Sequence, residues 1–208
     1  VTGVSRAGKK ARFRKVAAPG KAGEELAIEV GREHRWTPDS PWLYDLNIEL
    51  RKNGRKTDSV AAYFGMRKVS LGTDEQGVTR IMLNDKFAMQ IGTLDQGFWP
   101  DGIYTAPTDA ALRYDIEMLK KMGYNMTRKH VKVEPDRWYY WTDKLGLLVW
   151  QDMPSMGGAK TDEQKTHFEE ELRRLVEGRC LHPSIIMWVV FNEGWGQYDT
   201  PRLTEWVK

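Results

Sequence analysis

At 208 residues, the chain is long enough to bury the core of one large domain or of parts of two. Its hydrophobic fraction of 40% and its nearly balanced 32 basic and 29 acidic side chains exclude a disordered or fibrous protein. The single cysteine, Cys180, excludes an internal disulfide and, with only four histidines, argues against a zinc site, while no apolar run is long enough to span a bilayer.

The first 21 residues carry seven Lys or Arg and no acidic residue, and a basic arm for nucleic acid is one interpretation of them. The strand-like alternation of Leu26, Ile28 and Val30 directly afterwards favours a solvated hairpin, so we expect no nucleic-acid partner and no membrane partner. Because segment 1–6 has neither an initiating Met nor the pattern of a signal peptide, we expect the chain to begin inside a longer protein.

Strand signals dominate the chain up to Leu71. Apolar and polar residues alternate over 46–50, Asn53-Gly54 supplies a tight turn, and segment 59–69 resumes an extended pattern. Together these signals predict a β-hairpin with further strands on either side. We therefore predict that residues 1–71 form part of a β-sandwich domain.

Strands and helices alternate in the rest of the chain, from about Ile81 onward. An open doubly wound sheet would alternate in the same way, but its first strand usually leads into a GxGxxG phosphate loop, whose spacing segment 92–97 lacks. We therefore predict that residues 72–208 form about four β/α units, the first half of a TIM barrel. Since a half-barrel leaves unpaired strand edges, we expect the chain to continue beyond its last residue. The expected strands are 87–92, 124–127, 147–150 and 185–191, and the expected helix starts are Thr108, Pro135, the Thr161–Gln164 capping box and Thr200-Pro201.

The apolar run 185–191 shows no alternation, which is typical of a parallel strand buried on both faces, and it stops at Asn192-Glu193. In a parallel β/α barrel the carboxyl ends of the strands open into the active site, so a carboxylate there is a candidate catalytic group. Polar and aromatic residues follow the other expected strands too, a pattern suited to a small hydroxylated ligand. The full set is Asp95, Gln96, Trp99 and Asp101; Arg128, Lys129 and His130; Gln151 and Asp152; and Asn192, Glu193 and Trp195.

Several motifs spread over most of the chain resemble glycoside hydrolase family 2, the group that includes β-galactosidases, β-glucuronidases and β-mannosidases. Two motifs look like the end of that family's immunoglobulin-like sandwich: Ser40-Pro41-Trp42-Leu43-Tyr44 and Tyr63-Phe64-Gly65-Met66-Arg67. One motif looks like its entry into the barrel: Leu83-Asn84-Asp85-Lys86. The others resemble its second and third barrel units, in Gly123-Tyr124-Asn125-Met126-Thr127-Arg128, Pro135 with Trp138-Tyr139, and Asp143-Lys144-Leu145-Gly146-Leu147, and its fourth, in His182-Pro183-Ser184 with Trp188 and Phe191-Asn192-Glu193.

The resemblance implies a retaining glycosidase in which Glu193 is the general acid/base, Asn192 hydrogen-bonds the 2-hydroxyl of the sugar, and Arg128 keeps the nucleophile charged. The nucleophile should be a second Glu, about 5 Å away. In this family it lies on the seventh barrel strand, which has no counterpart in this chain. We therefore expect these 208 residues to be inactive by themselves.

The partner that the resemblance implies is a carbohydrate, a β-glycoside, with no cofactor and no metal ligand in this chain. It leaves open a homo-oligomer of the full-length parent. The candidate sugar contacts are Asp95, Trp99, Asp101, His130, Asp152 and Trp195.

The chain also departs from the better-known members of the family. They carry Asn-Arg-His-Glu where this chain has Thr93-Leu94-Asp95-Gln96, and a His-Tyr pair where it has Lys129-His130. We therefore transfer no sugar specificity. Two alternatives remain: a non-catalytic carbohydrate-binding barrel, and another barrel enzyme such as a lyase or aldolase, for which Lys129 is the candidate Schiff-base residue.

Overall fold

The computed structural model describes residues 2–4, 18–30, 34–157, 161–194 and 196–208. The chain divides into two compact units, Val1–Phe87 and Ala88–Lys208. This division falls later than the predicted domain boundary after Leu71, because the strands that follow Leu71 pair within the first unit. We describe each unit separately.

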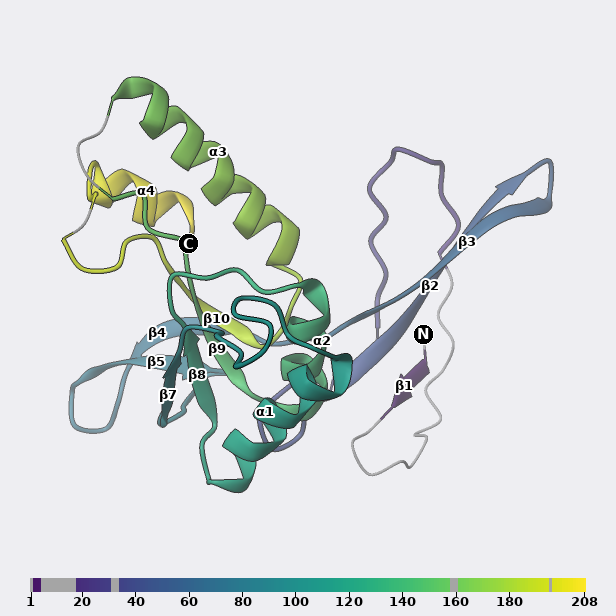
Figure 1. Ribbon diagram of the computed structural model, residues 1–208. Helices are drawn as coiled ribbons and strands as arrows, with labels where there is room; N and C mark the ends of the chain where they lie inside the picture. Colours follow the sequence, from purple (N-terminus) through teal and green to yellow (C-terminus); the bar gives the residue numbers. More distant parts are fainter. Residues whose placement is uncertain (1, 5–17, 31–33, 158–160, 195) are drawn as a thin grey trace. The chain divides into compact units, whose positions relative to one another are not determined.

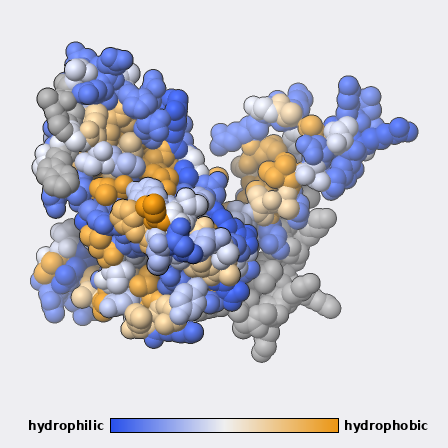
Figure 2. Space-filling view, in the orientation of Figure 1, coloured by the Kyte–Doolittle hydropathy of each residue, from blue (hydrophilic) through white to orange (hydrophobic). Residues whose placement is uncertain are grey.

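The first unit is made of antiparallel strands, in agreement with the predicted β-rich half. One sheet has the order β1-β2-β3 and a second has the order β4-β5-β6. Asn53 and Gly54 turn the chain between β2 and β3 with φ values of 52° and 76°, the positive values that a tight hairpin turn requires. In Figure 2 the tip of this hairpin is hydrophilic. The strands are β1 (Thr2–Val4), β2 (Leu43–Lys52), β3 (Arg55–Phe64), β4 (Val69–Thr73), β5 (Thr79–Leu83) and β6 (Lys86–Phe87).

Aromatic side chains form the core of the first unit at the base of the β2–β3 hairpin. Trp36 and Tyr44 are fully buried, and the Tyr44 ring stacks on Phe64 with 5.1 Å between ring centroids. The Tyr44 hydroxyl accepts a hydrogen bond from the backbone N–H of His34 at 2.6 Å, which satisfies the polar end of this buried ring. These aromatic side chains therefore have a structural role in the first unit.

The second unit contains a parallel sheet with the order β10-β9-β8-β7, and each strand is followed by a helix. In Figure 1 the strands run side by side, with α1 next to α2 and with α3 next to α4. In chain order the elements are β7 (Gly92–Asp95), α1 (Asp109–Lys121), β8 (Met126–Lys129), α2 (Asp136–Leu145), β9 (Leu148–Asp152), α3 (Asp162–Arg179), β10 (Ile185–Val189) and α4 (Thr200–Trp206).

The first parallel strand is not where the sequence pattern predicted it. Phe87 pairs with Met82 in the antiparallel sheet of the first unit, so segment 87–92 is not a parallel strand and β7 begins only at Gly92. The second strand also begins later than predicted, at Met126, because Tyr124 still donates its N–H to Leu119 O at the end of α1. Both differences arise where hydrogen bonds from a neighbouring element continue past the expected boundary.

The predicted helix starts are confirmed. The Thr108 hydroxyl accepts from Ala111 N at 3.1 Å, and Thr161 and Gln164 form a reciprocal capping box at the start of α3. Two apolar clusters hold the helices to the sheet. One combines α1 and α2 with β9 and β10, and the other combines α3 and α4 with the ends of those strands; their members are Leu112, Ile116, Trp138, Tyr139, Trp141, Leu147, Val149 and Ile185, and then Met153, Phe168, Leu172, Leu175, Val190 and Leu203.

Candidate active site

The parallel sheet has two chemically different faces. Leu94 of β7, Arg128 of β8 and Trp150 of β9 are register partners, and so are the next residues, Asp95, Lys129 and Gln151. Because successive side chains of a strand point to opposite faces, these two rows lie on opposite sides of the sheet. Gln151 and Lys129 are at most 1% exposed, beneath α1 and α2, whereas Leu94 is 56% exposed. We call these the covered face and the open face.

Arg128, Asp152 and Asn192 meet on the open face. Arg128 Nε and Nη2 donate to Asp152 Oδ1 and Oδ2 at 2.9 and 2.8 Å, a bidentate pair, and Nη2 also donates to Asn192 Oδ1 at 2.9 Å. The Asp152 carboxylate is fully buried and accepts a further hydrogen bond from Val131 N at 3.2 Å. We call Arg128, Asp152 and Asn192 the open-face triad.

The contact with Arg128 fixes the orientation of the Asn192 amide. Since Asn192 Oδ1 accepts from the guanidinium, the Nδ2 group is the end of the amide that can donate to a ligand. Asn192 is 5% exposed, so little water competes for that position. The arrangement therefore presents an oriented hydrogen-bond donor just beyond β10, which ends at Val189 and not at Phe191 as predicted.

Glu193 follows Asn192 directly and is exposed to solvent. Its φ is 55°, in the left-handed region, which costs a residue with a side chain on the order of 1–3 kcal/mol. Gln197 Nε2 donates to the backbone carbonyl of Glu193 and so closes the turn that follows Glu193. Trp195, predicted as a sugar contact, lies outside the described residues.

Asp95 and Trp99 are not brought to the open face. Asp95 points to the covered face and pairs with Lys129, because it is the register partner of that residue and not of Arg128. Trp99 packs against the apolar cluster of α1 and α2, and its indole Nε1 is buried without a hydrogen-bond partner among the described residues. Grouping these residues by strand end alone ignored the alternation of side chains along the strand.

The other candidate sugar contacts lie at loops. Asp101 is exposed in the loop after β7. His130 follows β8 and is partly exposed; its Nδ1 lies 3.1 Å from Gln96 Nε2, and its backbone N–H donates to Asp95 O at 2.9 Å. Asp152 is therefore the one predicted sugar contact that the described part of the chain places beside Arg128, where the guanidinium occupies both of its oxygens.

Lys129 does not have the environment of a Schiff-base lysine. It is 1% exposed, and its ammonium lies between the carboxylates of Asp95 and Glu134, 2.9 Å from Glu134 Oε1. The Trp138 ring covers it, with 4.4 Å between Nζ and the ring centroid. A carbonyl substrate would have to displace these partners on the covered face, so the geometry disfavours the lyase or aldolase alternative.

Sequence reasoning named Gln151 but missed the hydrogen-bonded cluster that surrounds it on the covered face. The Tyr139 hydroxyl donates to Gln151 Oε1 at 2.6 Å, and Gln151 Nε2 donates to Lys132 O at 2.7 Å. Burial raises the pKa of the Tyr139 hydroxyl, which keeps it protonated as a donor. Lys132 and Glu134, each 3% exposed, belong to the same face. The alternation of Arg128 and Lys129 along β8 was the available signal that two polar sites exist.

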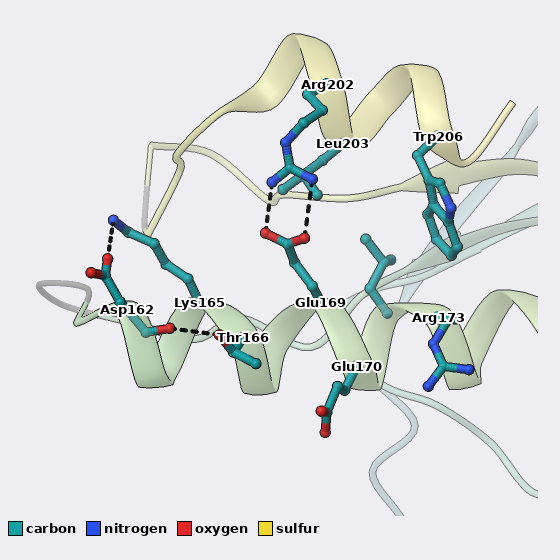
Figure 3. A pocket seen from close by; sticks show the side chains of 10 residues that line it. Asp162, Lys165, Thr166, Glu169, Glu170, Arg173, Arg202, Leu203 and Trp206 are labelled. Carbon is teal, nitrogen blue, oxygen red and sulfur yellow. Dashed lines mark hydrogen bonds and ion pairs between the residues drawn. The ribbon is translucent and has the colours of Figure 1, made fainter.

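A hollow of about 490 Å³ lies between α3 and α4, away from the triad residues (Figure 3). Arg202 reaches across it to Glu169 with nitrogen–oxygen distances of 2.7 and 3.1 Å, and this pairing lowers the pKa of Glu169. The hollow therefore belongs to the packing of two helices. Within the described ranges no helix is long and apolar enough to cross a membrane, and no group of His, Cys, Asp and Glu side chains is arranged to hold a metal ion.

Two family models match the chain. The model of glycosyl hydrolases family 2 matches residues 3–67, and the model of the TIM barrel domain of glycosyl hydrolases family 2 matches residues 105–208. The fold class is thereby confirmed in its coarser form: an immunoglobulin-like portion followed by part of a TIM barrel. Residues 68–104 lie between the two matches, so the exact domain boundary stays a prediction.

Similar proteins include glucuronidases and galactosidases. A putative beta-glucuronidase of Formosa agariphila is 32% identical over 160 residues, 76% of this chain and 19% of that protein, and a beta-galactosidase of Lactococcus lactis is 26% identical over 89% of this chain and 19% of that protein. Among solved structures, a β-glucuronidase from Ruminococcus gnavus in complex with D-glucuronic acid matches with a TM-score of 0.79 at 21% identity, over 99% of this chain and 34% of that one. The chain thus spans about a fifth of the length of these curated relatives.

Proposed function

Because this chain belongs to the glycosyl hydrolases of family 2, we propose that it is part of a retaining β-glycosidase in which Glu193 is the general acid/base. The observation that supports this role most directly is the open-face triad: Arg128 holds Asn192 at the end of β10, and Glu193 is the next residue of the chain. In a parallel barrel this end of the strands faces the substrate.

The proposed reaction proceeds by double displacement at the anomeric carbon. In the first step Glu193 donates its proton to the glycosidic oxygen as the bond to the leaving group breaks, and a second carboxylate forms a covalent bond to the sugar. In the second step the Glu193 carboxylate removes a proton from water, which attacks the anomeric carbon and releases the sugar. The covalent nucleophile belongs to a later part of the protein, about 5 Å from Glu193.

Asn192 and Arg128 prepare the site for this chemistry. The Asn192 Nδ2 group would donate to the 2-hydroxyl of the sugar, a contact that strengthens as positive charge develops at the neighbouring anomeric carbon. Arg128 is already held by Asp152 and Asn192, so its positive charge is fixed in position before substrate binds. In the complete barrel this charge would favour the ionised form of the nucleophile.

The proposed substrate class is β-glycosides, and residues 72–208 would supply the first four β/α units of the barrel. The similar proteins act as glucuronidases and galactosidases according to their names, which supports a β-glycoside without selecting its sugar. Because the nucleophile lies elsewhere, these 208 residues alone should not hydrolyse a glycoside.

The test uses the complete protein that contains these residues, with a panel of aryl β-glycosides that includes glucuronides, galactosides and mannosides. We expect turnover of one sugar, loss of turnover in Glu193→Ala, and recovery with azide as the β-glycosyl azide. Glu170→Ala, an exposed glutamate on α3, is the matched control and should keep wild-type activity. No turnover of any β-glycoside by the folded protein would refute the proposal and favour a non-catalytic carbohydrate-binding barrel.

A further inference from the structure

A closed ring of hydrogen bonds and ion pairs lies on the covered face, outside the residues used in the proposed mechanism. Lys129 Nζ contacts Asp95 Oδ2, and Asp95 Oδ1 accepts from the Gly97 N–H at 2.7 Å. The Gly97 carbonyl accepts from Lys132 Nζ at 2.6 Å. Lys132 Nζ lies 3.2 Å from Glu134 Oε1, and the same oxygen accepts from Lys129 Nζ at 2.9 Å, which closes the ring.

The ring is balanced in charge, and three of its four charged side chains are buried. Lys129, Lys132 and Glu134 are 1%, 3% and 3% exposed, whereas Asp95 is 31% exposed, and two ammonium groups face two carboxylates. Removing one member of such a group leaves the others as buried charges without a full set of partners, which is strongly unfavourable. The ring therefore acts as one unit, and the loss of any member should weaken its hold on the segment attached to it.

What the ring holds is the loop after β7. Gly97 sits directly on it: an added Cβ would lie 2.5 Å from both Glu134 Oε1 and Lys132 Nζ, and its φ is 67°, which favours glycine. Lys132 Nζ also donates to Tyr104 O at 2.9 Å, at the far end of the same loop. Both ends of segment 97–104 are thus anchored to one ammonium group.

Gln96 connects this loop to His130, one of the predicted sugar contacts. It lies between Asp95 and Gly97 of the ring, and its Nε2 lies 3.1 Å from His130 Nδ1. The backbone of His130 is itself bonded to Asp95 O at 2.9 Å. With Gln96 as the donor, His130 carries its proton on Nε2 and presents a second hydrogen-bond donor at the strand ends.

We propose that the ring of Lys129, Asp95, Gly97, Lys132 and Glu134 positions the Gln96–His130 pair to bind hydroxyl groups of the β-glycoside. Lys132 and Glu134 are then positioning residues that set substrate affinity, and they have no part in proton transfer. This inference rests on the proposed function, since it takes the β-glycoside as the ligand. It predicts an effect on KM that is separate from the effect of Glu193 on kcat.

The experiment compares the complete wild-type protein with Lys132→Met, Gly97→Ala and the double variant, using the preferred aryl β-glycoside. Each single variant should raise KM roughly tenfold and change kcat less than about twofold, because the substrate contacts shift while the acid/base stays in place. The double variant should be little worse than either single one, since both break the same contact. Lys121→Met, at an exposed position of α1, is the control and should leave both constants unchanged.

Hydrogen exchange of the backbone amides of 97–104 is measured on the same proteins. Protection should fall in this loop in Lys132→Met and Gly97→Ala and stay unchanged in Lys121→Met. Unchanged protection, or a fall in kcat with KM unaltered, would overturn the positioning role. If the wild-type protein turns over no β-glycoside, the proposed function fails while the exchange result still decides whether the ring holds the loop. Gly97→Ala keeps both lysines and provides the test if Lys132→Met does not fold.

Discussion

The substitution Arg128→Met should lower the free energy of opening of β8 and β9 by more than the removal of a surface ion pair would. Asp152 is fully buried, and without the guanidinium its carboxylate would keep only the Val131 N–H at 3.2 Å among the hydrogen bonds described above. Breaking a buried pair by removing one partner costs on the order of 3–5 kcal/mol. Because 27% of the Arg128 side chain is exposed and solvent screens that end of the pair, we expect a value near the lower limit, about 3 kcal/mol.

Native-state hydrogen exchange of the β8 and β9 amides measures this free energy of opening without requiring the whole protein to unfold in two states. Arg174→Met is the matched control, since Arg174 is also 2.8 Å from a carboxylate oxygen, that of Glu171, but both side chains are exposed. It should change the opening free energy of α3 by less than about 1 kcal/mol.

A double variant separates the cost of an unpaired charge from the value of the pair itself. Arg128→Met with Asp152→Leu removes both charges, so most of the lost stability should return even though activity does not. An opening free energy of Arg128→Met within about 1 kcal/mol of wild type would contradict the reasoning, because leaving a buried carboxylate unpaired should destabilise the strands by more than that.

Two further changes test the covered face. Asp115 on α1 is exposed, but the pKa of its carboxyl is raised, first by partial desolvation and then by the charge of Asp95, so its ionised form is slightly disfavoured in the folded protein. The stability of the folded state therefore falls as pH rises from 3.8, the ordinary pKa of an aspartate, through the raised pKa. Asp115→Asn should increase the thermal midpoint at neutral pH but not below 3.8, and an equal shift at both pH values would contradict this linkage. Tyr139→Phe leaves Gln151 Oε1 buried without its 2.6 Å donor and should cost about 1–3 kcal/mol in the exchange of β9, with Tyr140→Phe, at a partly exposed neighbour, as the control.

The sequence predicted local structure well where the signal is local. The caps at Thr108 and Thr161 accept from backbone N–H groups three residues ahead, so neighbouring residues alone specify them. The hairpin turn at Asn53-Gly54 is equally local, because it needs two positive φ values in succession. The start of the first parallel strand was misplaced because Phe87 pairs with Met82, a choice between two possible partners that no local pattern settles.

The sequence by itself determined the order of strands and helices, their caps and the Asn192-Glu193 dipeptide after the last strand, since these depend on residues close together in the chain. Only the tertiary structure decided which polar residues share a face. The packing of the parallel strands brings Arg128 to Asn192 across 64 residues on the open face, and Lys132 to Gly97 across 35 residues on the covered face. The physical reason is that a strand alternates its side chains with a period of two, so one residue along β8 separates the proposed catalytic side from the side that positions the loop.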